Sequence, residues 1–310
     1  MSKALVPSFA TKHTLRMPMV LIIFLIHCVA LAAPFTFSWP GFITFLILVP
    51  ITACLGITLC YHRLLSHRSF KTHKWVQYFL MLCGTLSLEG DPTWWVATHR
   101  LHHKESDQEN DPHSPQVSFL WSHILWLFFE DGRMADKTFM KRFAPELYND
   151  PWAKFLQKHF LSVNIGFILL LTAAGYSYGG TTMALSMLVW GGAFRIVWVW
   201  HVTWFVNSVT HIYGYRNYQT TDTSKNIWWV ALLAFGEGWH NNHHANPRAA
   251  KSGHKWWEFD FTYCIIKAME LTKLAWKLHP VVALDARKFV NSSDKDKVIP
   301  LKVKQAGLGL

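Results

Sequence analysis

Four long apolar segments divide the chain, and they fall into two pairs. They cover residues 17–33, 41–60, 160–178 and 182–205. A helix rises 1.5 Å per residue, so about 20 residues cross the ~30 Å hydrocarbon core of a bilayer. Within each pair the link is short, at 34–40 and 179–181. The pattern predicts an all-α membrane protein with four transmembrane helices arranged as two hairpins.

Three shorter apolar runs lie outside these pairs, at 75–88, 117–129 and 226–235. Each is short for a bilayer span, and their tryptophans suit a membrane–water interface. We expect helices that lie on the membrane surface, although buried core helices would show the same pattern. Together with the polar stretches around them, these runs predict a helical cap.

The predicted domain organisation follows from these segments. Residues 61–159 and 206–280 form the cap, and with the four spans they make a single domain over residues 1–280. Residues 281–310 are polar and basic, and we expect a surface tail there.

Lysine and arginine are distributed almost entirely on one side of the predicted membrane. Residues 1–17, 61–159 and 206–310 hold 29 of the 30, and the short links hold none. The exception, Arg195, lies inside the fourth segment. Because lysine and arginine favour the cytosolic side, we expect both termini and the whole cap to be cytosolic.

Composition supports a membrane protein and argues against other classes. The chain is 51% hydrophobic and 16% charged, against about 25% charged in average globular chains. The net charge of +11 is explained by the one-sided distribution, and no Lys/Arg tract with interleaved aromatics indicates a nucleic-acid site. The five cysteines show no C-x-x-C spacing, so a disulfide framework is not expected.

Histidine is the residue type that carries candidate chemistry, with 18 copies. The spacing H-x-x-H-H occurs twice, and a further pair precedes them. These clusters hold His62 and His67; His99, His102 and His103; and His240, His243 and His244. Residues at i, i+3 and i+4 share one helix face, so each triplet is expected to converge on one point. All three clusters, and His211 after the fourth segment, lie on the predicted cytosolic side.

Neutral imidazole is the commonest metal ligand in proteins. Nine histidines exceed the needs of one metal, so two metals with four or five ligands each are predicted. H-E-x-x-H is absent, which argues against a zincin protease, and a structural zinc site would normally include cysteine. The alternatives are surface histidines of a basic protein and a metal-binding or metal-transporting membrane protein.

Three further polar residues are candidates near this site. His113 is close in sequence to the second cluster, and it is predicted to contact that cluster's histidines without being a metal ligand itself. His201 and Arg195 lie inside the fourth segment, where polar groups are functional suspects, and each is predicted to line a channel. For Arg195, snorkelling or pairing near the cytosolic end is the alternative.

The histidine boxes "HRLLSH", "HRLHH" and "HNNHH" resemble those of the membrane fatty-acyl desaturase family. The resemblance covers about residues 17 to 280. The flanks "GDPTWWVATHRLHHKESDQENDPHSP", "FVNSVTHIYG" and "FGEGWHNNHHANP" are similar to the Δ9 (stearoyl-type) branch, particularly its bacterial and plant members.

The resemblance implies a di-iron centre that uses O2 to place a cis double bond in a saturated acyl chain. His211 would be the ninth ligand, and Asn207 would reach a metal through water. Trp95 and Trp204 match channel positions, although plain core aromatics would look the same. Acceptors for the imidazole N–H groups would be the nearby carboxylates, Asp107, Asp111 and Glu237.

One departure bears on the substrate. Animal acyl-CoA members have an Arg-Asp pair before the second box, where this chain has Ala97 and Thr98. This favours a lipid-linked acyl chain over acyl-CoA. No fused cytochrome b5 is expected, so a separate ferredoxin, or a cytochrome b5-type donor with its reductase, would supply electrons. A di-iron membrane hydroxylase is the alternative activity.

Overall fold

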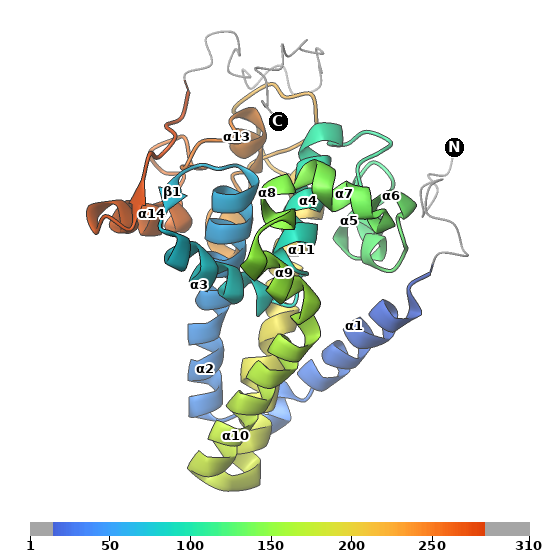
Figure 1. Ribbon diagram of the computed structural model, residues 1–310, viewed down its shortest axis with the longest axis vertical. Helices are drawn as coiled ribbons and strands as arrows, with labels where there is room; N and C mark the ends of the chain where they lie inside the picture. Colours follow the sequence, from blue (N-terminus) through green and yellow to red (C-terminus); the bar gives the residue numbers. More distant parts are fainter. Residues whose placement is uncertain (1–14, 283–310) are drawn as a thin grey trace.

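The computed structural model describes residues 15–282, apart from the side chains of residues 135 and 137. The fold is mostly helical, as expected (Figure 1). Long helices extend together toward one end, and shorter helices and loops gather at the other as a cap. Nearly all of the predicted tail, from residue 283 on, lies outside the described residues.

The elements follow one another in this order: α1 (Met17–Ala30), η2 (Ala33–Thr36), α2 (Trp39–Val49), η3 (Pro50–Ser66), β1 (Lys71–Thr72), α3 (Lys74–Thr85), α4 (Pro92–Glu105), α5 (Phe119–His123), η4 (Leu125–Leu127), α6 (Gly132–Ala135), α7 (Lys137–Phe143), α8 (Pro145–Tyr148), α9 (Pro151–Lys158), α10 (Phe160–Ser186), η5 (Met187–Phe194), α11 (Arg195–Ile212), α12 (Trp228–Leu233), α13 (His240–Ala245), α14 (Phe261–Leu271) and β2 (Ala275–Trp276).

Within residues 15–282, two continuous helical runs are long and apolar enough to cross a membrane. The first, α2 with η3, covers Trp39–Ser66 in 28 residues, and the second covers Phe160–Ile212 in 53. The second run reverses direction at Gly179 and Gly180, whose backbone is not helical, and Gly180 has a φ of 65°. It is therefore a helical hairpin with its turn where the sequence predicts one. The apolar α1 is shorter, at 14 residues.

Both runs continue further into the cap than expected. The first ends at Ser66 rather than near residue 60, so His62 lies on the helix and not beyond it. The second continues to Ile212 and carries His211 in its last turn. Polar residues can extend a helix past its apolar part because backbone hydrogen bonding does not depend on side-chain polarity.

Polar contacts join the two hairpins at the end away from the cap. Ser38 begins α2, and its Oγ accepts a hydrogen bond from Gly41 N. The same Oγ lies 2.7 Å from the Oγ of Ser186, which ends α10 in the second hairpin. Trp190 Nε1 donates to Ala33 O at 3.1 Å. These bonds satisfy polar groups that would otherwise face an apolar surrounding.

The expectation of helices alone is incomplete. Strands β1 and β2 pair antiparallel, with Lys71 opposite Trp276. This two-stranded sheet fastens the chain just after η3 to the segment that follows α14. All three short apolar runs form helices within their predicted bounds or one residue beyond, as α3, α5 with η4, and α12.

Glycines allow η3 and α3 to pack closely beneath the cap. A Cβ atom on Gly56 would lie 2.4 Å from the backbone nitrogen of Gly84, and one on Gly84 would lie 2.4 Å from the Tyr61 ring. Small residues let helices approach in this way in membrane proteins. This contact positions the end of η3, which carries the first histidine box.

We predict that Gly56→Ala destabilises the protein, because the methyl group meets backbone atoms that cannot move aside. Overpacking of this kind costs about 1–3 kcal/mol. The midpoint temperature of thermal unfolding in detergent should fall by several degrees. Size-exclusion chromatography after heating would measure it. Gly166→Ala on α10 is the control, since no atom lies within 4 Å of its Cβ position. Equal midpoints for the two variants would contradict this account.

Candidate metal centre

Nine histidines come together in two groups where the long helices enter the cap. Within each group, one ring nitrogen from every histidine lies within 4.8 Å of those of the others. The five-histidine group consists of His62, His67, His99, His103 and His243, and the four-histidine group of His102, His211, His240 and His244. These are the nine histidines that the sequence singles out.

Four helix segments bring these side chains to one place. The first box lies at the end of η3, the second on α4, His211 in the last turn of α11, and the third on α13. Asp91 begins α4 as an N-cap, with its carboxylate accepting from the backbone N–H groups of Thr93 and Trp94. This N-cap fixes the residue at which α4 starts, and therefore the directions in which its histidines point.

The expectation that each H-x-x-H-H triplet converges on one point is wrong. His99 and His103 belong to the five-histidine group, whereas His102 belongs to the other. On α13 the division is reversed, because His240 and His244 belong to the four-histidine group. Consecutive helical residues are about 100° apart around the axis, so adjacent histidines point to different places. Each box therefore serves both groups.

The nitrogen spacing fits metal coordination. The Nε2 atoms of His62 and His243 are 3.0 Å apart, and those of His67 and His99 are 2.8 Å apart. In the four-histidine group, the Nε2 atoms of His211 and His240 are 3.0 Å apart. Imidazole nitrogens bind metals such as zinc at about 2.1 Å, so two at a right angle lie about 3 Å apart.

A buried nitrogen without a hydrogen-bond partner also indicates a metal site. Nε2 of His244 is buried and has no hydrogen-bond partner among the described residues. It belongs to the four-histidine group, where a metal would satisfy it. A buried polar atom left unpaired would otherwise cost free energy.

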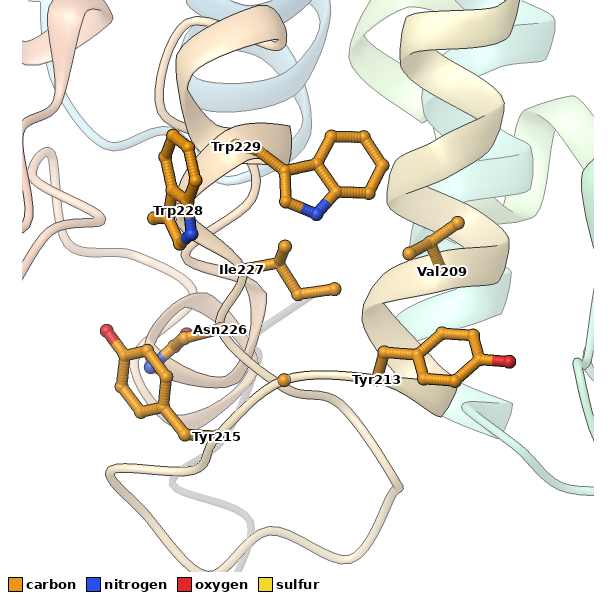
Figure 2. Close-up of a pocket in the computed structure, with 8 residues that line it drawn as sticks. Val209, Tyr213, Tyr215, Asn226, Ile227, Trp228 and Trp229 are labelled. Carbon is orange, nitrogen blue, oxygen red and sulfur yellow. The ribbon is translucent and has the colours of Figure 1, made fainter.

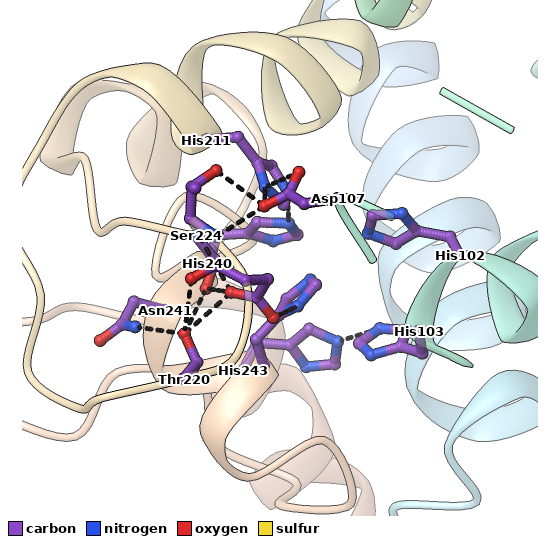
Figure 3. A network of polar contacts seen from close by, with 12 residues as sticks. His102, His103, Asp107, His211, Thr220, Ser224, His240, Asn241 and His243 are labelled. Carbon is purple, nitrogen blue, oxygen red and sulfur yellow. Dashed lines mark hydrogen bonds and ion pairs between the residues drawn. The ribbon is translucent and has the colours of Figure 1, made fainter. Parts of the chain in front are cut away.

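Carboxylates contact four of the imidazoles on the side away from the metal groups, and Figure 3 shows one such pair, Asp107 with His211. Each contacts a histidine Nδ1: Glu237 at 2.8 Å from His62, Asp111 at 3.0 Å from His102, Asp107 at 3.2 Å from His211, and Asp222 at 2.7 Å from His244. Such contacts keep the proton on Nδ1 and leave Nε2 free to bind a metal. Three of these carboxylates are the predicted ones, whereas the sequence gives no spacing signal for Asp222.

The protonation states also favour metal binding. Burial and the neighbouring imidazoles lower the pKa well below its usual value for His67, His99, His103, His240 and His243. These five imidazoles are therefore neutral, with a free lone pair. Although burial opposes it, contact with His244 holds the pKa of Asp222 well below its usual value, so this carboxylate is ionised.

Arg63 connects Glu237 to a further acid. Its Nε donates to Glu237 at 3.0 Å, and its Nη1 donates to Asp260 at 2.9 Å. The guanidinium is 1% exposed, so both carboxylates compensate a fully buried charge. Sequence reasoning missed this role; the available signal was a charged residue directly after His62 on a largely apolar helix.

The two asparagines inside "HNNHH" face away from the metal groups. Asn241 accepts hydrogen bonds from the backbone N–H groups of Asn217 and Tyr218, both at 2.8 Å. Asn242 donates to Glu258 at 2.7 Å and accepts from Asn226 at 2.9 Å. Both asparagines are fully buried. They fix α13 to the loops around it, a role that their spacing did not reveal.

Other predicted site residues lie around the two groups. Trp95 stacks on His99, with ring centroids 5.1 Å apart. His113 stacks on His102 at 4.3 Å, and burial lowers its pKa to about 3. Asn207 lies one turn before His211 on α11, and no hydrogen bond of its side chain is found within residues 15–282.

A half-buried carboxyl that the sequence analysis did not single out lies beside Trp95. Glu89 accepts hydrogen bonds from Trp95 Nε1 at 3.2 Å and from Thr203 Oγ1 at 2.8 Å. Burial raises the pKa of Glu89 to about 7. It therefore connects α4, beneath the five-histidine group, to α11.

The remaining predicted channel residues lie deeper along α11. Trp204 is buried in a cluster with Ile23, Ile196 and Trp200. Arg195 is fully buried and does not snorkel, because its Nη1 donates to Leu86 O at 2.7 Å.

His201 belongs to a separate hydrogen-bonded chain of histidines. Its Nε2 is 3.2 Å from His27 Nε2, and its Nδ1 is 3.0 Å from His123 Nε2. The chain ends at Ser208, whose Oγ is 3.0 Å from His123 Nδ1. These histidines therefore lie outside the two metal groups.

A cavity of about 490 Å³ lies between the end of α11 and α12 (Figure 2). Its walls include Val209, Tyr213, Tyr215, Trp228 and Trp229. None of the nine histidines lines it, and neither does Trp95 or Trp204. It is therefore distinct from the predicted acyl channel.

Comparison with known proteins agrees with this arrangement. A sequence model of the fatty acid desaturase family matches residues 37–279. The sn-1 stearoyl-lipid 9-desaturase of Anabaena variabilis is 48% identical over 81% of this chain and 89% of its own length. The sn-2 palmitoyl-lipid 9-desaturase of Nostoc sp. (strain 36) is 41% identical over 89% of this chain and 94% of its own length.

A relative with a differently named substrate also matches. An acyl-CoA 5-desaturase of Anemone leveillei is 43% identical over 81% of this chain and 75% of its own length. The family match and these identities, with the two histidine groups, lead to one conclusion: the chain belongs to the fatty acid desaturase family, a family of oxidoreductases.

Proposed function

We propose that the protein is an O2-dependent acyl-lipid desaturase that places a cis double bond at the Δ9 position of a saturated, glycerolipid-linked acyl chain. The observation that carries this proposal is the pair of histidine groups, five and four imidazoles side by side, in a member of the desaturase family. The relatives named as acting on lipid-linked chains at position 9 support the substrate and the position.

Two irons are the proposed metals, one for each histidine group. The nine histidines would hold them, with Asn207 reaching one through water. When bound, the iron pair supplies the oxidising power for O2-dependent removal of hydrogen from an unactivated methylene, which amino-acid side chains lack. The four carboxylates at Nδ1 keep the imidazoles oriented before metal arrives.

The acyl chain is proposed to pass between α4 and α11. Trp95, stacked on His99, would form one wall near the metals, and Trp204, with the more distant His201 and Arg195, the deeper part. The bond from Thr203 to Glu89 and from Glu89 to Trp95 ties these walls together. Fixed walls would hold one methylene beside the metals and exclude water, which is how a rigid site raises rate and selectivity.

The proposed membrane arrangement is four crossings with both termini and the histidines on the cytosolic side. The hairpin turn at Gly179 and Gly180, the apolar α1 and the long run Trp39–Ser66 support the crossings. The one-sided lysine and arginine distribution supports the orientation. The histidines lie at helix ends in the cap, whereas a transport site would lie near the bilayer midplane.

Ala97 and Thr98 support a lipid-linked substrate. Both are buried on α4, so this helix offers no charged pair to a CoA headgroup at these positions. Electrons are proposed to come from a separate ferredoxin, or from a cytochrome b5-type protein with its reductase.

Expression in a host that lacks its own desaturase should produce a cis-Δ9 monounsaturated acid in membrane glycerolipids. Fatty-acid analysis by gas chromatography, after separation of lipid classes, would measure it. His103→Ala should abolish the product, because it removes a ligand of the five-histidine group. His159→Ala, outside both groups, should retain it. A hydroxylated product, or activity that survives in His103→Ala, would contradict the proposal.

Asp222→Asn should weaken metal binding by about 10- to 100-fold, the usual effect of losing a carboxylate behind a histidine ligand. Iron retained by the purified protein, titrated against a chelator, would measure the change. Asp136→Asn is the matched control, since this exposed carboxylate caps α7 and contacts none of the histidines. Equal iron affinities in the two variants would show that Asp222 does not support His244.

A further inference from the structure

The segment from Lys255 to Phe261 has two different sides. Trp256 is 95% exposed, and Trp257, Phe259 and Phe261 are also exposed. The acids between them point inward, with Glu258 1% and Asp260 3% exposed. This segment, the aromatic loop, thus presents four aromatic rings outward and two carboxylates inward.

The first inward carboxylate is attached to the helix of the third histidine box. Glu258 accepts hydrogen bonds from Asn242 Nδ2, Asn217 Nδ2 and Tyr215 OH, each at 2.7 Å. Asn242 lies on α13 next to His243. A displacement of Glu258 would therefore release α13, which supplies ligands to both histidine groups.

The second inward carboxylate is attached to the first histidine box. Asp260 accepts from Arg63 Nη1 at 2.9 Å and from the backbone N–H of Ser252 at 2.7 Å. Arg63 in turn contacts Glu237, and Glu237 contacts Nδ1 of His62 at 2.8 Å. Hence the aromatic loop reaches the five-histidine group by a second, independent route.

The outer side of the loop lies at the membrane end of the cap. The Phe261 ring is 5.7 Å from that of Phe235, which packs against a buried cluster formed by the long helices, Phe45, Val49, Ala53 and Val199. Nearby, α12 also leaves large side chains uncovered, with Trp228 65% and Leu232 66% exposed. Figure 1 shows α14, which begins at Phe261, beside η3 and near the level of α3.

A lysine at this side fits an anionic lipid surface. Lys255 is exposed, with its Nζ 5.1 Å from the centre of the Tyr215 ring and 5.9 Å from that of Trp257. Tyr215 also lines the cavity of Figure 2. Aromatic rings next to lysines are typical of protein surfaces at the headgroup level of a bilayer.

We propose that the aromatic loop inserts into the cytosolic leaflet of the membrane and that this insertion stabilises the metal-binding histidines through Glu258 and Asp260. The metal part of this inference rests on the proposed function; the insertion part does not. The partner is a lipid surface that contains anionic headgroups, and the loop connects that surface to both histidine groups.

Insertion is tested by spin labelling. A nitroxide is attached at Trp256→Cys, or at Lys141→Cys on α7 as the water-exposed control, with the exposed Cys28 and Cys264 changed to serine. In phosphatidylcholine–phosphatidylglycerol vesicles, the label at 256 should collide more with O2 than with a water-soluble nickel chelate, and the label at 141 should do the opposite. Equal nickel accessibility at the two positions would overturn insertion.

Coupling to the metal site is tested with Trp256→Ser combined with Phe259→Ser. Both side chains are largely exposed, so the change leaves the protein's own packing intact. In vesicles, the rate at which a chelator removes bound iron should be several-fold higher for this variant than for the unsubstituted protein. In detergent, where no lipid leaflet is present, the two rates should be equal. An unchanged rate in vesicles, or an equal rise in both media, would overturn the coupling. If the unsubstituted protein holds no iron, the proposed function fails while the labelling result still stands.

Discussion

The structure depends on holding nine imidazoles with their metal-binding nitrogens turned toward one another. Neighbouring nitrogens only about 3 Å apart would repel one another if protonated, and burial alone cannot choose which nitrogen carries the proton. Carboxylates at Nδ1 make that choice for four of the rings. Contacts within the cap hold these acids in position, as Thr223 does for Asp107, and Arg63 compensates the charge of Glu237.

Much of this could be predicted because it is local in sequence. Apolar runs of about 20 residues predicted the long helices, and Gly179 and Gly180 lie where a turn was expected. Asp111 lies nine residues after His102, so their contact was within reach of sequence reasoning. Glu237 lies three residues before His240, but it contacts His62 on a distant helix instead.

What could not be predicted depends on contacts between distant segments. Asp222 reaches His244 from a loop 22 residues away, and Glu258 reaches Asn242 across another. The expectation that each histidine triplet converges on one point was wrong for a different reason. Helix periodicity was applied correctly to i and i+4, but i+3 and i+4 were treated as one direction although they diverge by about 100°.

The division of each H-x-x-H-H box has a mechanical consequence. On α4, two histidines face the five-histidine group and one faces the four-histidine group, and on α13 the numbers are exchanged. Each helix thus supplies ligands to both histidine groups. A rotation of the helix about its axis would displace ligands of the two groups together. A movement of either helix that reshapes one histidine group therefore also alters the other.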